Sequence, residues 1–250
     1  MKTACISQMS WTDFAEISKT VHTVILPAGA MECYGPHLPL ASDTIVAEAV
    51  ARRLAERTEA LIGPTIPVGD SASLSMFPGT LCVRPESFRN YMQDLLDSLL
   101  KWGMTNFLFI NGHAGNTPLL SQLAMQYRLR DDTLRFAQID WWRYVQAECP
   151  GVLDHTGYMG TGHAGECGTS VLMYLAPELV HRDRLRCVEP KVVNGKRFPG
   201  VLRTTPFNEF SEAGMIGDAS AATAEKGRLI VERSIDRILA YMEQDFTDQR

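Results

Sequence analysis

Hydrophobic and polar positions along the chain form blocks that predict strands and helices in turn. Four short runs rich in β-branched, aliphatic and aromatic residues have the length and composition of strands. These runs span residues 21–26, 60–68, 106–110 and 134–139. The third run, Asn-Phe-Leu-Phe-Ile, is apolar almost throughout, which is typical of a strand buried on both faces. Pro64 and Pro67 in the second run favour an edge position or a kink.

Between the strand-like runs, apolar residues recur at helical spacing. Asp43 and Thr44 begin one helix, whose apolar face includes Val46, Val50 and Leu54. A second helix begins at Arg84-Pro85-Glu86, because proline suits a first helical position, and it ends at Gly103. Further helices are expected over residues 11–17, 117–129, 163–175 and 219–246, the last of them broken near Gly227.

This alternation of strands and helices predicts the fold class. Connections of these lengths suit right-handed crossover units. We therefore expect an α/β fold, a three-layer α/β/α sandwich with a mostly parallel, doubly wound central sheet. Residues 149–162 are expected to form a loop, and residues 181–218 to be irregular or weakly β. Because the sequence shows no internal repeat or low-complexity linker, residues 1–250 are expected to form a single domain.

Composition narrows the classes of partner. The 250 residues are 45% hydrophobic and 21% charged, with a net charge of −5, which argues against a nucleic-acid or anionic-membrane partner. No apolar stretch reaches the length of a membrane span, and the first residues lack the apolar segment of a signal peptide. The six cysteines include no Cys-x-x-Cys pair, so we expect reduced thiols and a cytoplasmic location.

Residues 29–43, Gly-Ala-Met-Glu-Cys-Tyr-Gly-Pro-His-Leu-Pro-Leu-Ala-Ser-Asp, carry the densest set of candidate ligands. This opening loop brings Glu32, Tyr34, His37 and Asp43 into one short segment. Its glycines and prolines prevent regular structure. A loop of this kind is either a polar turn or the floor of a metal site, and its spacing alone does not decide between them.

Two further polar segments follow. In open parallel sheets, ligands bind at the carboxyl ends of the strands, and the segment with His113 at residues 111–116 follows the third predicted strand. A histidine in a helix-capping turn is an equally good interpretation of His113 alone. His163 and Glu166 would share a helix face, as a ligand with an acid–base group or as an ordinary capping pair. Three such segments on one rim favour a metal site.

These segments together resemble the creatininase family, also called creatinine amidohydrolase-like, over most of the chain. The family pattern Gly-x-x-Glu-x-His-Gly-Pro-His-Leu-Pro, followed by Asp, is matched by residues 29–43 with one departure. Its Phe-Pro-Gly-Thr, Asn-Gly-His-Gly-Gly-Asn, His-Ala-Gly-Glu and C-terminal segments are matched by residues 77–80, 111–116, 163–166 and 214–227.

The resemblance implies a two-metal hydrolase that assembles as a homohexamer. Glu32 and His113 would hold one ion, Asp43 would bridge, and Glu166 would reach the second ion. The ions would be Zn²⁺ and/or Mn²⁺, one or two per chain, and a metal-bound hydroxide suits attack on an amide carbonyl. His163 would pass a proton to the leaving nitrogen.

Departures from the family pattern bear on the second ion. Tyr34 stands where the family has a metal-binding histidine. Three outcomes are open: Tyr34 ligates the metal, His37 takes its place, or the second ion is weak or absent. Tyr34 is equally well interpreted as an aromatic cover for the loop. Gly168 replaces a glutamate that often follows the His-Ala-Gly-Glu segment, and Leu74 replaces a histidine before Phe-Pro-Gly-Thr.

Other departures bear on the substrate. Ala114 and Met159 stand where creatininase has a tyrosine and a gating tryptophan, so creatinine itself is not the expected substrate. Ser71 and Trp142 are candidates for substrate binding, although a tryptophan beside a strand end also suits the core. We expect a hydrolase of a small polar, cyclic amide or a formamide. The alternatives are hydrolytic ring opening of an inositol-derived cyclic diketone, and a non-catalytic assembly subunit with a decayed metal site.

Overall fold

The computed structural model describes residues 3–191 and 204–246, which are built around a parallel sheet of four strands in the order β2–β1–β3–β4. The strands are β1 (Thr23–Ala28), β2 (Leu61–Ile62), β3 (Asn106–Asn111) and β4 (Arg135–Asp140). β1 pairs in parallel with β3 along its whole length, and β3 pairs in the same way with β4. The predicted α/β class and parallel sheet are confirmed.

The sheet divides the hydrophobic core into two halves. Successive side chains of a strand point to opposite faces, and every residue of β3 is buried. Leu108 and Ile110 therefore pack into the core on one face, and Phe107 and Phe109 into the core on the other. A strand with no polar face is stable only between two layers of helices, which is where β3 lies.

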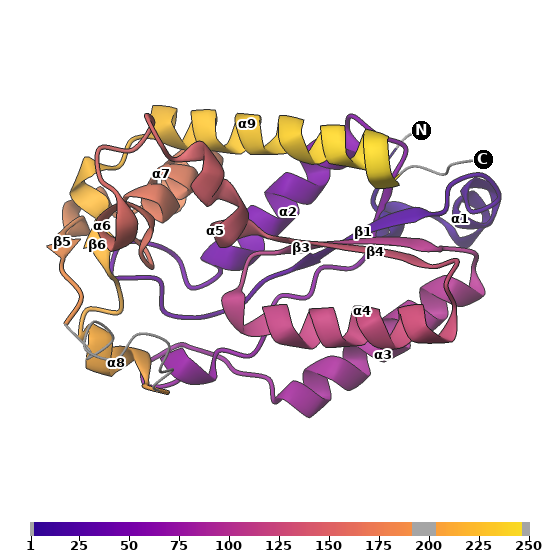
Figure 1. The fold of residues 1–250 in the computed structure, drawn as a ribbon, viewed down its shortest axis with the longest axis horizontal. Helices are drawn as coiled ribbons and strands as arrows, with labels where there is room; N and C mark the ends of the chain where they lie inside the picture. Colours follow the sequence, from indigo (N-terminus) through magenta and orange to yellow (C-terminus); the bar gives the residue numbers. More distant parts are fainter. Residues whose placement is uncertain (1–2, 192–203, 247–250) are drawn as a thin grey trace.

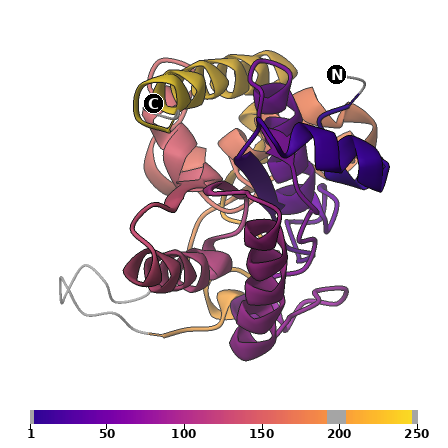
Figure 2. The same cartoon turned by 90° about the vertical axis from the view of Figure 1, so that its right-hand side faces the viewer.

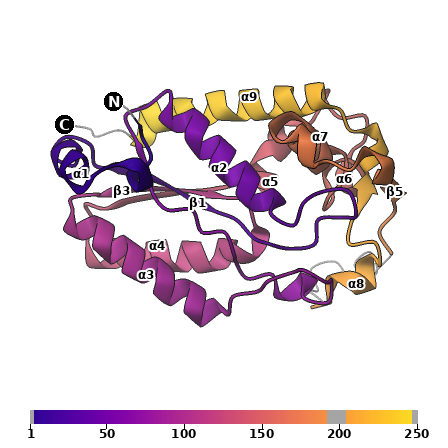
Figure 3. The ribbon, with the colours of Figure 1, turned by 180° about the vertical axis from the view of Figure 1, so that it is seen from behind.

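Helices cover both faces of the sheet (Figure 1; Figure 3 shows the reverse side). One face carries α2 (Ser42–Ala55), α7 (Glu166–Leu175) and α9 (Ala224–Tyr241), and the other carries α3 (Pro85–Lys101) and α4 (Thr117–Arg130). Figure 2 shows α9 and the α3–α4 pair on opposite sides of the molecule. The structure thus has the three layers that the sequence predicts.

The longest crossover helix, α3, follows from a simple pattern. α3 has Pro85 at its first position, and its buried residues Phe88, Met92 and Leu96 recur every four residues. Gly103, at a φ of 85°, follows the end of this helix, in a conformation that favours glycine. These residues place a continuous apolar stripe against the sheet.

The remaining α-helices and strands are short. They are α1 (Trp11–Ile17), α5 (Trp141–Tyr144), α6 (Gly157–Thr161), α8 (Phe207–Phe210), β5 (Cys187–Val188) and β6 (Gly217–Asp218). α6, α7 and α8 gather beyond α5, the helix that follows β4, at one end of the molecule (Figure 1). In residues 3–191 and 204–246, no helix is both long and apolar enough to cross a membrane.

Several predicted boundaries are wrong. The strand expected over residues 60–68 keeps only Leu61–Ile62 and one further bridge, from Ile66 to Ala28, because Pro64 and Pro67 lack the N–H groups that continue a ladder. The helix expected from His163 begins at Glu166 instead, after a turn. The loop expected over residues 149–162 contains α6.

The C-terminal helix also differs from the prediction. It begins at Ala224 and continues through Gly227 without a break. A Cβ at position 227 would lie 1.9 Å from the carbonyl oxygen of Ser170, so glycine is needed there for close packing on α7. Residues 242–246 form a single π-helical turn. Of the segment expected to be irregular, residues 192–203 lie outside the described part of the chain, and the rest contains β5, β6 and α8.

Candidate metal centre

The candidate site lies at the point where the sheet topology reverses. From β1 the chain passes to β2 on one side, and from β3 it passes to β4 on the other. The crevice between the carboxyl ends of β1 and β3 is therefore the switch point at which ligands bind in such sheets. Glu32 follows β1, His113 follows β3, and Asp43 lies in the first turn of α2.

Two glycines let the helix bearing Asp43 approach both loops. A Cβ at Gly112 would lie 2.3 Å from the carbonyl oxygen of Asp43, and one at Gly29 would lie 2.3 Å from Oγ1 of Thr44. Side chains at these positions would push the start of α2 away from the strands. Thr44 Oγ1 also donates a hydrogen bond of 3.0 Å to the Ala30 carbonyl, which holds the helix to the opening loop.

Two asparagines on either side of His113 fix the loops against one another. Asn111 Nδ2 donates to the His113 carbonyl at 2.8 Å, and Asn111 Oδ1 accepts from the His113 N–H at 3.2 Å. Asn116 Nδ2 donates to the Gly29 carbonyl at 2.9 Å, and its Oδ1 accepts from the Asp70 N–H at 3.2 Å. Asn116 therefore ties together the loops that follow β1, β2 and β3.

These elements bring Glu32, Asp43 and His113 together. One ligand atom from each residue lies within 4.8 Å of the other two. His113 Nδ1 is 3.3 Å from Glu32 Oε1 and 3.3 Å from Asp43 Oδ2. All three side chains are buried, and buried carboxylates are found in proteins when a hydrogen bond, a countercharge or a metal compensates them.

The orientation of His113 is set by a backbone carbonyl. Its Nε2 lies 2.7 Å from the carbonyl oxygen of Asp70, which can only accept, so Nε2 carries a hydrogen and Nδ1 faces the carboxylates. Burial lowers the pKa of His113, but hydrogen bonds and charge from Asp43 and Glu32 outweigh it and raise this pKa to about 11. A hydrogen on Nδ1 between the two carboxylates is thereby favoured, and a divalent cation can take its place.

The two carboxylates respond differently to their surroundings. Burial would raise the pKa of Glu32, but the hydrogen bond and charge of His113 hold it below its usual value. Burial raises the pKa of Asp43. Glu32 Oε2 is buried and has no hydrogen-bond partner in the described part of the chain. This oxygen is free to accept from a water or to bind a cation, and the three residues fit one divalent ion held by two oxygens and one nitrogen.

A pocket of about 290 Å³ opens over this cluster. Aromatic rings form part of its wall. The Tyr34 ring lies 4.3 Å from the His163 ring and 5.7 Å from the Trp142 ring, and the Phe207 ring lies 4.9 Å from His163. Trp142 also donates its Nε1–H to Asp43 Oδ1 at 2.8 Å. The predicted residues Tyr34, Trp142 and His163 thus line the same pocket as the cluster.

The orientation of His163 is also set by a backbone carbonyl. Its Nε2 lies 2.8 Å from the carbonyl oxygen of Cys33, so Nε2 carries a hydrogen and Nδ1 is left to accept or release a proton. The next residue, Ala164, has a φ of 56°, a conformation that costs about 1–3 kcal/mol outside glycine. Thr169 Oγ1 donates to the Ala164 carbonyl at 3.1 Å and holds this turn.

Glu166 lies outside the cluster of Glu32, Asp43 and His113, although the family resemblance implies that it binds the second ion. Its Oε1 accepts from Lys226 Nζ at 2.6 Å and from the Asp154 N–H at 2.8 Å, and its Oε2 accepts from the His155 N–H at 3.1 Å. It is also the first residue of α7, with His163 in the preceding turn, so the two do not share a helix face. The carboxylate joins α9 to the loop before α6.

His37 does not take the place of the missing histidine. It is buried, and its Nε2 lies 2.8 Å from Thr169 Oγ1, away from the cluster. Tyr34 packs against Gly168: a Cβ there would lie 3.1 Å from the Tyr34 hydroxyl. Burial raises the pKa of Tyr34 well above its usual value, so the phenol is neutral. Ser71 is buried beside Glu32, whose pKa it helps to lower, and it does not line the pocket.

Some contributors have no clear signal in the sequence. The Asp70 and Cys33 carbonyls orient the two histidines, and a backbone group has no residue-type signature. Phe207 reaches the pocket from a segment more than forty residues beyond His163. The asparagines at positions 111 and 116 are different, because two amides around a loop histidine after a buried strand do indicate a fixed loop.

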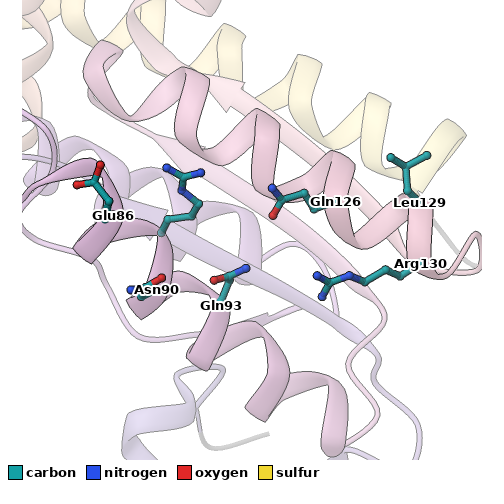
Figure 4. Close-up of a pocket in the computed structure, with 7 residues that line it drawn as sticks. Glu86, Asn90, Gln93, Gln126, Leu129 and Arg130 are labelled. Atoms are coloured by element: carbon teal, nitrogen blue, oxygen red, sulfur yellow. The ribbon is translucent and has the colours of Figure 1, made fainter.

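A larger hollow of about 680 Å³ lies on the outer surface between α3 and α4 (Figure 4). It is lined by Glu86, Arg89, Asn90, Gln93, Gln126, Leu129 and Arg130. None of these residues belongs to the cluster, and the hollow lies on the helical layer rather than at the strand ends. Position and chemistry both favour the smaller pocket as the functional site.

Comparison with known proteins gives the family of the chain. Residues 7–242 match the family model described as Creatininase, creatinine amidohydrolase. The chain is 29% identical over 257 residues to the mycofactocin precursor peptide peptidase of Mycobacterium tuberculosis, covering 96% of this chain and 93% of the relative. It is 27% identical over 265 residues to the creatinine amidohydrolase of Pseudomonas putida, covering 98% of both. A 3-dehydro-scyllo-inosose hydrolase of Thermotoga maritima is 23% identical over 245 residues, covering 91% and 79%.

Solved structures share the fold. A creatininase in a manganese form superimposes with a TM-score of 0.84 at 23% identity, covering 98% of this chain and all of that one. A creatininase variant of the Zn-Zn type gives the same TM-score and identity, covering 99% and 100%. At this level of identity the similarity establishes the three-layer fold.

Proposed function

The chain belongs to the creatininase family of hydrolases, and on this premise we propose that it is a divalent-metal-dependent hydrolase that cleaves the C–N bond of a small polar, cyclic amide or of a formamide. The observation that carries the proposal is the buried cluster of Glu32, Asp43 and His113 at the switch point of the sheet. Two carboxylates and an imidazole that converge at the floor of a pocket form a ligand set for a catalytic ion, with a position left for water or substrate.

Zn²⁺ and Mn²⁺ are the ions that we propose. Glu32, Asp43 and His113 would hold the ion, and the Lewis acidity it supplies would activate water near neutral pH and polarise a substrate carbonyl. The protein contributes the rest. The Asp70 carbonyl fixes the tautomer of His113, the Trp142 indole fixes one oxygen of Asp43, and burial keeps bulk water from the ligand atoms.

His163 is the proposed acid–base residue. Its Nε2–H is held by the Cys33 carbonyl, and Tyr34 and Phe207 pack against its ring, so the imidazole is fixed with Nδ1 available. An imidazole exchanges a proton near neutral pH, as a leaving nitrogen requires. We propose that His163 Nδ1 takes a proton from the water that attacks the carbonyl and gives it to the nitrogen when the C–N bond breaks.

The size and walls of the pocket support a small substrate. A volume of about 290 Å³ is at the lower end of the range for small-molecule sites. The flat rings of Trp142, Tyr34 and Phe207 suit a planar group, such as an amide or a ring. Among the relatives, the peptidase and the creatinine amidohydrolase are named for cleavage of C–N bonds. Ring opening of an inosose-type diketone, as in the name of the Thermotoga relative, is the second candidate.

We also propose a quaternary state and a location. Assembly as a homohexamer rests on the resemblance to the family, and a cytoplasmic location rests on the six unpaired cysteines. Neither enters the chemistry proposed for the site.

Turnover and metal content of one variant test the function. Purified protein is incubated with amide, formamide and inosose panels, with and without Zn²⁺ or Mn²⁺. We expect metal-stimulated cleavage of an amide or formamide, and His113→Ala should abolish both turnover and bound metal. His181→Ala, at an exposed histidine, is the matched control and should retain both. Metal-stimulated turnover of inososes alone would support the second candidate. Bound metal below one equivalent that His113→Ala leaves unchanged, with no turnover on any panel, would indicate a non-catalytic subunit.

A further inference from the structure

We propose that this site holds a single metal ion, and that Tyr34, Gly168 and Trp142 together close the position that a second ion would occupy. The inference rests on the proposed function, because it concerns the same cluster. One structural neighbour is a creatininase variant of the Zn-Zn type, with which the number of ions proposed for this chain can be compared.

The first observation concerns the packing around Tyr34. The family resemblance expects a histidine at this position, but the phenol ring lies between His163 and Trp142, with centroid distances of 4.3 and 5.7 Å. Its hydroxyl lies against Gly168, where a Cβ would be 3.1 Å away. A glutamate at position 168, as the family often has, would meet this hydroxyl. The two departures therefore fit one another: the larger aromatic ring occupies space that the glycine leaves free.

The second observation concerns the carboxylate expected to bridge two ions. A bridge in which each ion takes one carboxylate oxygen requires Asp43 to offer both. Oδ2 faces His113 Nδ1 at 3.3 Å, but Oδ1 accepts the Trp142 indole N–H at 2.8 Å. The lone pair of Oδ1 that faces the indole is therefore taken by this hydrogen bond. This geometry suits a carboxylate that binds one ion through Oδ2 and is oriented from behind through Oδ1.

The third observation is the chemistry of the remaining pocket wall. Apart from the cluster, His163 and Cys167, the described residues that line the pocket offer no carboxylate, imidazole or thiol. Position 115 has no room for a ligand side chain, because a Cβ there would lie 2.1 Å from the Asp70 carbonyl oxygen and 2.6 Å from His113 Nε2. The sequence of residues 192–203 contains no Asp, Glu, His or Cys. Beyond the cluster, a second ion would find only His163, whose Nε2 faces the Cys33 carbonyl, and Cys167, whose Sγ lies 3.8 Å from Cys149 Sγ. These are fewer donors than a cation site needs.

A direct count of bound metal tests this inference. The full chain is loaded with excess Zn²⁺ or, separately, Mn²⁺, passed through a desalting column, and analysed by plasma mass spectrometry against protein concentration. We expect one ion per chain in the wild type and none in His113→Ala. Tyr34→Phe should retain one ion, because the phenol oxygen is not a ligand in this arrangement. Tyr158→Phe, at an exposed tyrosine, is the matched control and should also retain one ion.

The outcomes separate this inference from the proposed function. Two ions per chain with metal-stimulated turnover would overturn the single-ion site and leave the function intact. Loss of the ion in Tyr34→Phe, with an unchanged melting curve, would show that the phenol oxygen ligates and would also overturn it. No bound ion in the wild type would overturn both. If Tyr34→Phe does not fold, anomalous diffraction from wild-type crystals at the zinc edge decides: one peak per chain supports the inference, and two peaks overturn it.

Discussion

The Trp142 indole donates its N–H to Asp43 Oδ1 at 2.8 Å, while Oδ2 of the same carboxylate lies 3.3 Å from His113 Nδ1. Trp142 lies in α5, directly after β4, and from there its indole reaches Asp43 of α2. Asp43 is buried, and its rotation is set by this contact rather than by solvent. The tryptophan expected to bind substrate therefore also orients the residue that we propose as a metal ligand.

Trp142→Phe should weaken metal binding without removing it. The phenyl ring keeps most of the aromatic wall but cannot donate to Asp43, and loss of such an outer-shell hydrogen bond costs about 10–100-fold in metal affinity. Competitive titration against a chromophoric chelator measures the change in Kd. Trp102→Phe, at a half-exposed tryptophan at the end of α3, is the matched control and should bind metal like the wild type. Equal affinities in both variants would show that the indole bond does not support the site.

His163→Ala should separate metal binding from catalysis. The side chain lies outside the three-residue cluster, so we expect the bound metal to remain at the wild-type level. Loss of a general acid–base group lowers kcat by about 10²–10⁴-fold. Metal analysis and steady-state kinetics on the same preparation measure both quantities. Loss of the metal from this variant would show that His163 is itself a metal ligand, and the acid–base role proposed for it would be wrong.

The sequence was sufficient for the layers of the fold because each layer has a local pattern. One pattern is the apolar run of β3, and another is the four-residue repeat of Phe88, Met92 and Leu96 in α3. Each pattern predicts its element without knowledge of the neighbours against which that element packs. Boundaries were less predictable where tertiary contacts decide them. Gly227 would interrupt an isolated helix, but here its close approach to Ser170 makes it part of the packing between α7 and α9.

The site was partly predictable for a related reason. Glu32 and His113 each follow a strand, so the parallel order of β1 and β3 is enough to bring them together. The position of Glu166 could not be read in this way. Its partner Lys226 lies sixty residues further along the chain, and the spacing of three from His163 suggested a shared helix that the turn at Ala164 prevents.

Glu166→Gln should destabilise the fold and spare the metal. The substitution removes the buried negative charge beside Lys226, which keeps its ion pair with Asp154 Oδ2 at 2.8 Å, so we expect a loss of about 2 kcal/mol. For a chain of this length, that corresponds to a melting temperature lowered by about 6 °C. Metal content per folded chain should equal that of the wild type. Glu225→Gln, which removes an exposed pair with Arg228, is the control and should leave the melting temperature unchanged. Loss of metal with little loss of stability would instead return Glu166 to the ligand set.

His37 should make stability depend on pH in the mildly acidic range. Burial, with a smaller contribution from the charge of Arg186, lowers the pKa of His37 from 6.5 to about 4 in the folded protein. The buried ring donates from Nε2 to Thr169 Oγ1, because that hydroxyl gives its own hydrogen to the Ala164 carbonyl. Nδ1 has no hydrogen-bond partner in the described part of the chain. A second proton would therefore charge a buried group without compensation.

The sign of the effect follows from the two pKa values. Between about pH 6.5 and pH 4 the unfolded chain binds a proton at His37 and the folded chain does not, so this contribution to stability is present above pH 6.5 and is lost as the pH falls towards 4. At pH 5 the loss amounts to about 2 kcal/mol relative to pH 8. Urea unfolding at both pH values measures it. His37→Gln should remove this part of the pH dependence, whereas His181→Gln, at an exposed histidine, should retain it. An unchanged pH dependence in His37→Gln would show that the buried ring does not stay neutral as this hydrogen-bond arrangement requires.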